Sequence, residues 1–188
     1  VLADDTAWAE FVAADLLSQA EHGPDSQAML ITTSAALAVA VASEVDRQLA
    51  GLPRAEIATR ALAESRIVVV RSEAEMVELA NRYAAEHLIV ETARPEAVAE
   101  RIEQAGSIFL GHYSPESAGD YASGTNHTLP TSGWAAAYSG VNLDSFCKKI
   151  TLQRLTPEGL QRLGPIVERM ARAEGLEAHA RAVAVRLG

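Results

Sequence analysis

The chain has 188 residues and a mass of 20.0 kDa, with 48% hydrophobic and 22% charged residues, which is typical of a soluble globular domain. A domain of this size buries roughly 70% of the surface of its extended chain, so intrinsic disorder, a collagen repeat and a disulfide-built mini-protein are excluded. Sixteen Lys and Arg against 25 Asp and Glu give a formal charge of −9, so we expect no nucleic-acid or membrane partner.

A single cysteine, Cys147, excludes an intrachain disulfide and fits a reducing cytoplasm. The longest apolar stretch, Ala35 to Ala42, is too short to span a membrane.

Hydrophobic periodicity predicts alternating helices and strands in the first third of the chain. The first residues resemble the end of a strand. A helix is predicted over 11–22, a strand over 29–32, and an amphipathic helix after Ser34, where apolar residues recur every four positions. A helix over 54–64 then leads into the β-branched run 67–70, which is typical of a strand covered on both faces.

The same alternation continues through the middle of the chain. A capping-box pattern at 72–75 predicts a helix that runs to about Glu86. Strands are then predicted over 88–90 and 108–110, on either side of a helix that starts at Pro95. Strands and helices at these spacings predict a parallel-sheet α/β layer, an incomplete Rossmann-like fold.

The regular pattern ends at about residue 111. Up to about residue 140 the chain is rich in Gly, Ser, Thr, Pro and Asn, and so long a connection is usually functional or a linker. A further strand is predicted over 150–155. Beyond it, Gly164-Pro165 and Gly175 divide an amphipathic tail into three short helices. So short a tail cannot bury its own apolar stripes, so it must dock on this chain's layer or on a second subunit. The predicted parts are an α/β layer (1–125), an irregular connection (126–150) and a helical tail (151–188).

Two pairs of residues have side chains suited to acid/base or metal chemistry. Gln19 and His22 project from one face of a helix, where they could share a metal or a substrate or simply form a polar last turn. Glu86 and His87 place a carboxylate, which can activate water, beside an imidazole, which accepts a proton near neutral pH. A surface acid and a helix-capping histidine are the equally weighted alternative for this second pair.

Other candidates lie in the irregular connection and the tail. Asp120 is followed by turn residues and preceded by Gly119, as in many binding loops and in many ordinary turns. Glu174 and His179 flank Gly175, and spacing alone favours a solvated helix end for both. No zincin, nucleophile-elbow, P-loop or dinucleotide-binding motif is present. From the residues alone, the chain is an α/β domain with a candidate metal site made of oxygen and nitrogen ligands.

Four segments resemble blocks of the histidinol dehydrogenase family, in the order of the family. The segments are Asp-Leu-Leu-Ser-Gln-Ala-Glu-His-Gly-Pro-Asp-Ser (15–26), Tyr-Ala-Ala-Glu-His-Leu (83–88), Gly-Asp-Tyr-Ala-Ser-Gly-Thr-Asn-His-Thr-Leu-Pro-Thr (119–131) and Glu-Gly-Leu-Glu-Ala-His-Ala (174–180). They extend over nearly the whole chain. Because enzymes of this family are much longer, the chain resembles only their C-terminal portion.

The resemblance implies an enzyme of the last steps of histidine biosynthesis. Such an enzyme is a zinc-dependent, cytoplasmic homodimer that oxidises L-histidinol through L-histidinal to L-histidine and reduces two NAD molecules. The family's NAD-binding residues lie outside this chain, so the chain alone is expected to be inactive. In the family, the helical tail crosses to the partner subunit.

The resemblance also assigns roles to single residues. The implied zinc ligands are Gln19, His22, Asp120 and His179. The implied acid/base pair is Glu86, which activates water, and His87, which takes the alcohol proton. The implied substrate contacts are Gln19, His22, His87, Asp120, Glu174 and His179, with His127 nearby. His112 and Cys147 match no catalytic role and are expected to be structural.

Two other classes of function fit the same residues. One is a metal-dependent hydrolase in which Glu86 activates a zinc-bound water, and the other is a non-catalytic dimerisation fragment whose polar residues only cap and solvate. Zinc binding and the choice of substrate would separate the three.

Overall fold

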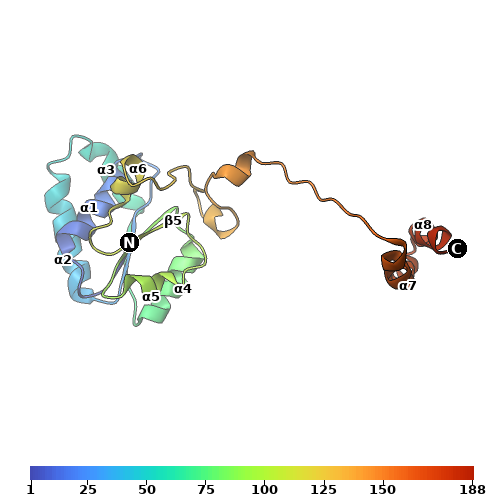
Figure 1. The fold of residues 1–188 in the computed structure, drawn as a ribbon. Coiled ribbons are helices and arrows are strands. Elements are labelled where there is room, and N and C mark those ends of the chain that lie inside the picture. The colour runs from blue at the N-terminus through green and yellow to red at the C-terminus, as the bar shows by residue number, and fades with distance from the viewer. The chain divides into compact units, whose positions relative to one another are not determined.

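A computed structural model describes all 188 residues, which form two compact units, Val1–Phe146 and Cys147–Gly188. We call them the α/β unit and the helical unit. The α/β unit contains one five-stranded sheet in the order β3-β2-β1-β4-β5, with every neighbouring pair parallel (Figure 1). Its strands are β1 (Leu2–Ala3), β2 (Met29–Thr32), β3 (Arg66–Val69), β4 (His87–Glu91) and β5 (Ser107–Leu110). The predicted parallel α/β layer is confirmed.

Helices cover both faces of this sheet because successive strand residues point to opposite sides. Ala3 and Leu30 join one core with α1 and α2, whereas Leu2 and Val90 join a second core with α4 and α5. The two layers of helices lie on either side of the strands in Figure 1. The helices of the unit are α1 (Ala9–Ala20), α2 (Ala35–Leu49), α3 (Ala55–Glu64), α4 (Glu73–Tyr83), α5 (Pro95–Ala99) and α6 (Glu116–Tyr121), with 3-10 turns at Trp134–Ala136 and Leu143–Phe146.

Three predictions about single elements were wrong. The β-branched run forms β3, but β3 lies at the edge of the sheet, where Ile67 and Val69 remain 39% and 50% exposed, so it is not covered on both faces. Residues 150–155 form no strand. The connection after β5, predicted to be irregular, contains the two-turn helix α6. The residues of these short segments do not by themselves indicate which neighbouring element covers them.

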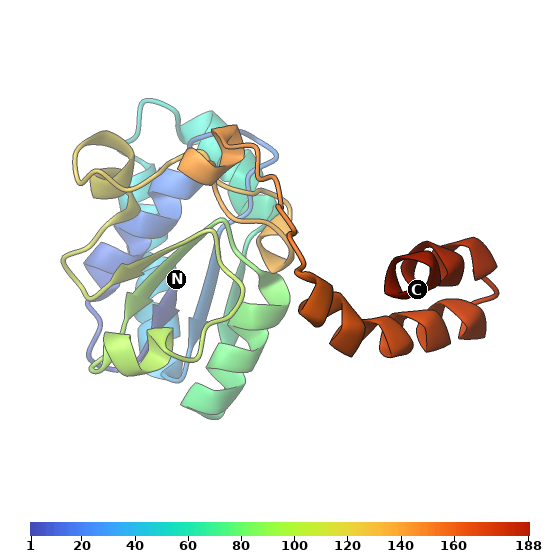
Figure 2. The same ribbon diagram turned by 45° about the vertical axis from the view of Figure 1, so that its right-hand side comes forward.

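The helical unit is a hairpin of two helices, α7 (Pro157–Ala173) and α8 (Glu177–Leu187), which lie side by side (Figure 2). The prediction of three helices was wrong, because α7 continues through Gly164 and Pro165. Pro165 removes one backbone hydrogen-bond donor from the helix but does not end it. The neighbouring Gly164 has no side chain, which leaves room for Val183 and Leu187 of α8. None of the helices in either unit combines the length and apolar character needed to cross a membrane.

Candidate metal and acid/base site

A cavity of about 1020 Å³ opens at the amino edge of the parallel sheet. The end of α1, the turn between α4 and β4, and the segment after α6 all contribute to its wall. The sequence-predicted residues that line it are Gln19, His22, Glu86, His87, Asp120 and His127. Glu174 and His179 belong to the helical unit, where both are exposed. The fold therefore collects six of the candidates around one cavity from three distant stretches of sequence.

Local structure explains how the first four of these residues reach the cavity. Gln19 occupies the last turn of α1, and His22 follows where the helix has ended. On the other side, Ala84 adopts a left-handed conformation with φ of 52° that ends α4 and turns the chain toward Glu86 and His87. His87 is the first residue of β4. This cavity lies at the amino ends of the strands. Most open α/β sheets instead bind ligands at the carboxyl ends of their strands.

The helix α6 supplies the carboxylates of the site. Glu116 and Asp120 are four residues apart, so they project from the same face of this short helix. The helix packs tightly beside β5, because a Cβ at Gly119 would lie 2.6 Å from Cε1 of Phe109. A glycine at this position therefore allows α6 to approach the sheet closely enough for Asp120 to line the cavity and for Glu116 to reach Gln19.

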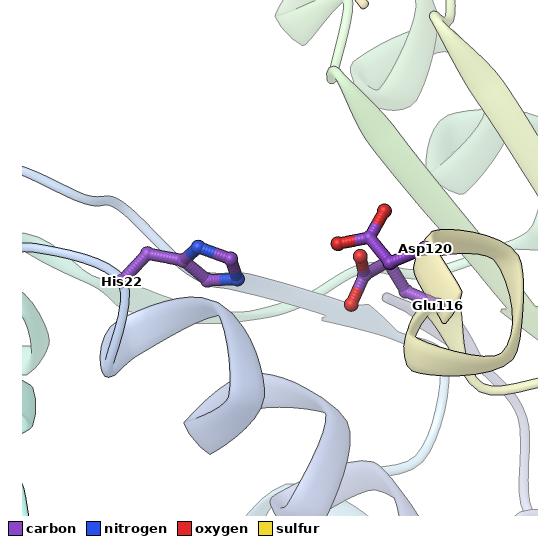
Figure 3. A group of neighbouring side chains, drawn as sticks. All are labelled: His22, Glu116 and Asp120. Carbon is purple, nitrogen blue, oxygen red and sulfur yellow. The ribbon is translucent and has the colours of Figure 1, made fainter. Parts of the chain in front are cut away.

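His22, Glu116 and Asp120 form a group that fits a metal ion. One nitrogen or oxygen atom from each residue lies within 4.8 Å of the other two. Figure 3 shows the His22 ring directed at the two carboxylates. Imidazole nitrogens and carboxylate oxygens are common zinc ligands, and a mixed set without thiolates is also seen in catalytic zinc sites. The donor chemistry of the group is therefore compatible with zinc.

A hydrogen-bonded chain links the metal group to the acid/base pair. The amide nitrogen of Gln19 donates to Oε2 of Glu116 over 2.8 Å, and the amide oxygen of Gln19 lies 3.0 Å from Nδ1 of His87. The other ring nitrogen of His87, Nε2, lies 3.9 Å from Oε1 of Glu116. Both of these last atoms are buried and have no hydrogen-bond partner. Buried polar atoms without partners are rare, and here they mark a place for a ligand.

Burial and neighbouring charges shift the pKa values of three groups of the site. Burial and the neighbouring Asp120 carboxylate raise the pKa of Glu116 to about 7. Burial also raises the pKa of Asp15, which lines the same cavity, to about 6. For His87, burial lowers the pKa despite the nearby Glu86 and Asp120 carboxylates. A neutral His87 imidazole is a competent proton acceptor near pH 7.

Glu116 is the site residue that the sequence prediction missed. It is 2% exposed and contacts both Gln19 and His87. The available signal was its spacing from Asp120 after Pro115, which together indicate a helix with two acids on one face. The surrounding Gly, Ser and Thr residues concealed that short helix.

The fold and this cavity define an α/β protein with a candidate metal centre beside an acid/base pair. The family model for histidinol dehydrogenase matches residues 1–187, and the chain belongs to that family. The expected family is thus confirmed, with the chain as a C-terminal portion.

Individual relatives agree with this assignment. The chain is 62% identical over 187 residues to histidinol dehydrogenase of Bacteroides thetaiotaomicron and 54% identical to that of Pectobacterium atrosepticum. In both comparisons the whole chain is covered, but only 44% and 42% of the relative. The crystal structure of histidinol dehydrogenase from Elizabethkingia anophelis superposes with a TM-score of 0.92 at 55% identity, over 99% of this chain and 43% of that one. The chain thus spans less than half the length of these relatives.

Proposed function

We propose that this chain carries the zinc-binding and acid/base part of an enzyme that oxidises L-histidinol to L-histidine with NAD. The observation that carries the proposal is the common cavity of Gln19, His22, Glu86, His87 and Asp120. Membership of the histidinol dehydrogenase family supports the substrate and the place in histidine biosynthesis. The reaction belongs to the cytoplasm in this proposal, in keeping with the free thiol of Cys147.

In this proposal the zinc ligands are Gln19, His22, Asp120 and His179. The first three come from the α/β unit and line the cavity, and His179 comes from a helical unit. Bound zinc would supply Lewis-acid attraction for the amine and imidazole nitrogens of the substrate. The side chains then position the alcohol carbon for reaction, which is the main contribution expected of such a site.

The proton transfers are assigned to the acid/base pair. In the first oxidation, His87 accepts the alcohol proton while the hydride leaves the carbon for the nicotinamide, and the aldehyde forms. Glu86 then removes a proton from the water that attacks this aldehyde. Loss of a hydroxyl proton to a base of the site and of a second hydride to a second NAD would then convert the hydrated aldehyde to the carboxylic acid. Glu174 contacts the substrate, and His127 lies close to it.

The helical unit is proposed to dock on a second copy of the chain. Its helices expose Leu163, Ile166, Val167 and Met170, and apolar stripes on a two-helix hairpin need an outside partner for burial. Docking would also bring His179 and Glu174 to the cavity of the partner. A homodimer is therefore part of the proposal.

Zinc titration of the purified chain tests the metal site. We expect His22→Ala and Asp120→Asn each to weaken zinc binding at least 10-fold, because each removes one ligand. His112→Ala is the matched control, since His112 does not line the cavity, and its affinity should equal that of the wild type. Unchanged zinc affinity in His22→Ala would contradict the metal site and favour a non-catalytic fragment.

A turnover assay tests the assignment of NAD binding to residues outside the chain. We expect no NADH from L-histidinol with this polypeptide, with or without zinc. Appreciable NADH formation would show that the chain holds its own NAD site. Zinc-dependent hydrolysis of an amide substrate would instead support the hydrolase alternative.

A further inference from the structure

The Glu116 carboxylate lies behind the cavity-lining residues Gln19 and His87 and is almost fully enclosed. It is 2% exposed, it accepts a hydrogen bond from Gln19, and it lies beside the unpartnered nitrogen of His87. Gln19 in turn contacts the opposite nitrogen of the same ring. Glu116, Gln19 and His87 therefore form a closed circuit in which each group faces the other two.

When Glu116 is ionised, its chemistry fixes the direction of the two hydrogen bonds of the Gln19 amide. A carboxylate oxygen that faces an amide must meet its NH2 group, because the amide oxygen has no proton to give. The Gln19 amide nitrogen therefore faces Glu116, and its oxygen faces Nδ1 of His87. An amide oxygen only accepts, so the ring nitrogen 3.0 Å away must carry the proton.

We propose that Glu116 is a positioning residue which, through the Gln19 amide, holds His87 in the tautomer with its proton on Nδ1 and an unprotonated Nε2. The tautomer of a histidine is set by the hydrogen bond that its other nitrogen makes, and here Glu116 determines which Gln19 atom makes that bond. The orientation of the Gln19 amide therefore links Glu116 to the tautomer of His87.

This arrangement suits a base. Nε2 of His87 is buried, has no hydrogen-bond partner, and lies 3.9 Å from a carboxylate oxygen that is also unpartnered. That separation exceeds hydrogen-bond distance, so the circuit leaves the Nε2 lone pair available. The amide oxygen of Gln19 has a second lone pair as well, so accepting from His87 does not prevent it from contacting a cation. The catalytic consequence rests on the proposed function, whereas the tautomer does not.

Nitrogen NMR of the histidine rings tests the proposal without any assay of activity. In metal-free 15N-labelled chain at pH 8, above the ordinary histidine pKa of about 6.5, His87 should show a protonated Nδ1 and an unprotonated Nε2. The signals are assigned by their loss in His87→Asn. In Glu116→Ala, water that fills the space can both donate and accept, so most of the unprotonated Nε2 signal should be lost.

A conservative variant and a matched control separate positioning from general destabilisation. Glu116→Gln keeps the size of the side chain but adds an NH2 group that can donate to the Gln19 oxygen, so it should give a mixture of the two tautomers. Glu116→Asp keeps a group that only accepts and should retain the wild-type tautomer. Glu91→Ala removes another buried carboxylate from β4, the strand that begins with His87, and should leave the His87 signals unchanged.

Three results would overturn the proposal. They are a wild-type His87 with its proton on Nε2, a folded Glu116→Ala with unchanged His87 signals, and loss of the tautomer in Glu91→Ala to the same extent. If Glu116→Ala fails to fold, the wild-type tautomer and the Glu116→Gln spectrum still decide. Failure of the proposed function would appear separately, as absent zinc binding with the tautomer intact.

Discussion

The two units of the molecule bury very different side chains. The α/β unit encloses large apolar residues, and Val12, Leu30 and Val90 have no exposed surface. The buried residues of α7 and α8 are small, namely Gly164, Ala171 and Ala180, whereas Ile166 and Met170 are 57% and 60% exposed. Roughly 25 cal/mol is gained for each Å² of apolar surface removed from water, so the α/β unit gains far more from its own packing.

This difference has a consequence for function. A site that needs fixed geometry requires rigid support, and the α/β unit holds six candidate residues around one cavity beside its packed core. The helical unit carries Glu174 and His179 on a hairpin that exposes most of its apolar surface. Their contribution therefore depends on what covers that hairpin, in agreement with the proposed docking on a second copy.

Substitution of one leucine in each unit gives the largest expected contrast. Leu30→Ala empties a fully buried position in β2 and should lower the free energy of unfolding by about 2–5 kcal/mol. Leu163→Ala in α7, where the side chain is 46% exposed, should cost the isolated chain less than about 1 kcal/mol. Urea unfolding followed by tryptophan fluorescence measures the first, because Trp8 and Trp134 both belong to the α/β unit. Urea unfolding followed by helical circular dichroism, which also reports α7 and α8, measures the second.

The urea titration that measures the cost of Leu163→Ala, repeated at increasing chain concentration, sharpens the test of docking on a second copy. If Leu163 becomes buried against a second copy, the cost of Leu163→Ala should rise with concentration, as linkage requires. A cost of several kcal/mol in the dilute monomer would show that the helical unit has its own tight core and would contradict the comparison.

The sequence predicted the elements of the α/β unit much better than their environment. Periodicity at Leu37, Val41 and Val45 located α2 because that pattern depends on the helix itself. The exposure of Val69 depends on strand order, which local sequence does not contain. In the same way α7 was divided wrongly at Pro165, since local sequence does not contain the packing of α7 against α8.

The candidate site follows the same rule. The family resemblance supplied Gln19, His22, Glu86, His87 and Asp120, which line one cavity. The hydrogen bond that Glu116 accepts from Gln19, 97 residues away in sequence, could not be predicted, because it exists only after α6 packs on β5. The amino-edge position of the cavity was likewise a result of the three-dimensional fold.

The buried carboxylates with the most strongly raised pKa values lie in the α/β unit. Glu91 is 1% exposed, its oxygens lack hydrogen-bond partners, and burial raises its pKa from 4.5 to about 8. The folded state therefore binds more protons than the unfolded state between about pH 4.5 and pH 8, so stability falls as pH rises through this window.

Glu91→Gln should remove that loss. We expect the free energy of unfolding at pH 8 to increase by about 1–3 kcal/mol. Little change is expected at pH 4, where Glu91 of the wild type is mostly protonated in both the folded and the unfolded state. Urea titrations at the two pH values measure this. Glu177→Gln, at a 71% exposed side chain of α8, is the control with no expected effect. A Glu91→Gln chain that is destabilised at pH 8 would contradict a raised pKa.

Two glycines at tight helix contacts give a smaller contrast. A Cβ at Gly119 meets the Phe109 ring at 2.6 Å and Oγ1 of Thr125 at 2.8 Å, so Gly119→Ala should displace α6 and cost about 1–2 kcal/mol. A Cβ at Gly164 meets the ends of Leu187 and Val183. These are the ends of flexible side chains and can move, and alanine favours a helix by about 1 kcal/mol over glycine.

We therefore expect Gly164→Ala to leave stability unchanged or to increase it slightly. Zinc titration adds a second measurement, since a displaced α6 moves Glu116 and Asp120 and should weaken binding in Gly119→Ala alone. Equal zinc affinity in both variants would show that the site tolerates movement of α6.

The smallest expected contrast concerns two matched helix caps. The hydroxyl of Ser72 accepts a hydrogen bond from the Glu75 backbone at the start of α4, and that of Thr156 accepts one from Gly159 at the start of α7. Each Ser or Thr to Ala change costs its helix about 1 kcal/mol. Ser72→Ala should reduce the cooperative unfolding free energy of the α/β unit by that amount, because α4 is part of its core.

Thr156→Ala should leave tryptophan-detected unfolding unchanged and instead raise amide exchange in the first turn of α7 about 5-fold, because a helix with few buried partners opens locally. If Thr156→Ala shifted the tryptophan transition as far as Ser72→Ala does, the two units would unfold as one, and the independence inferred from their buried residues would be wrong.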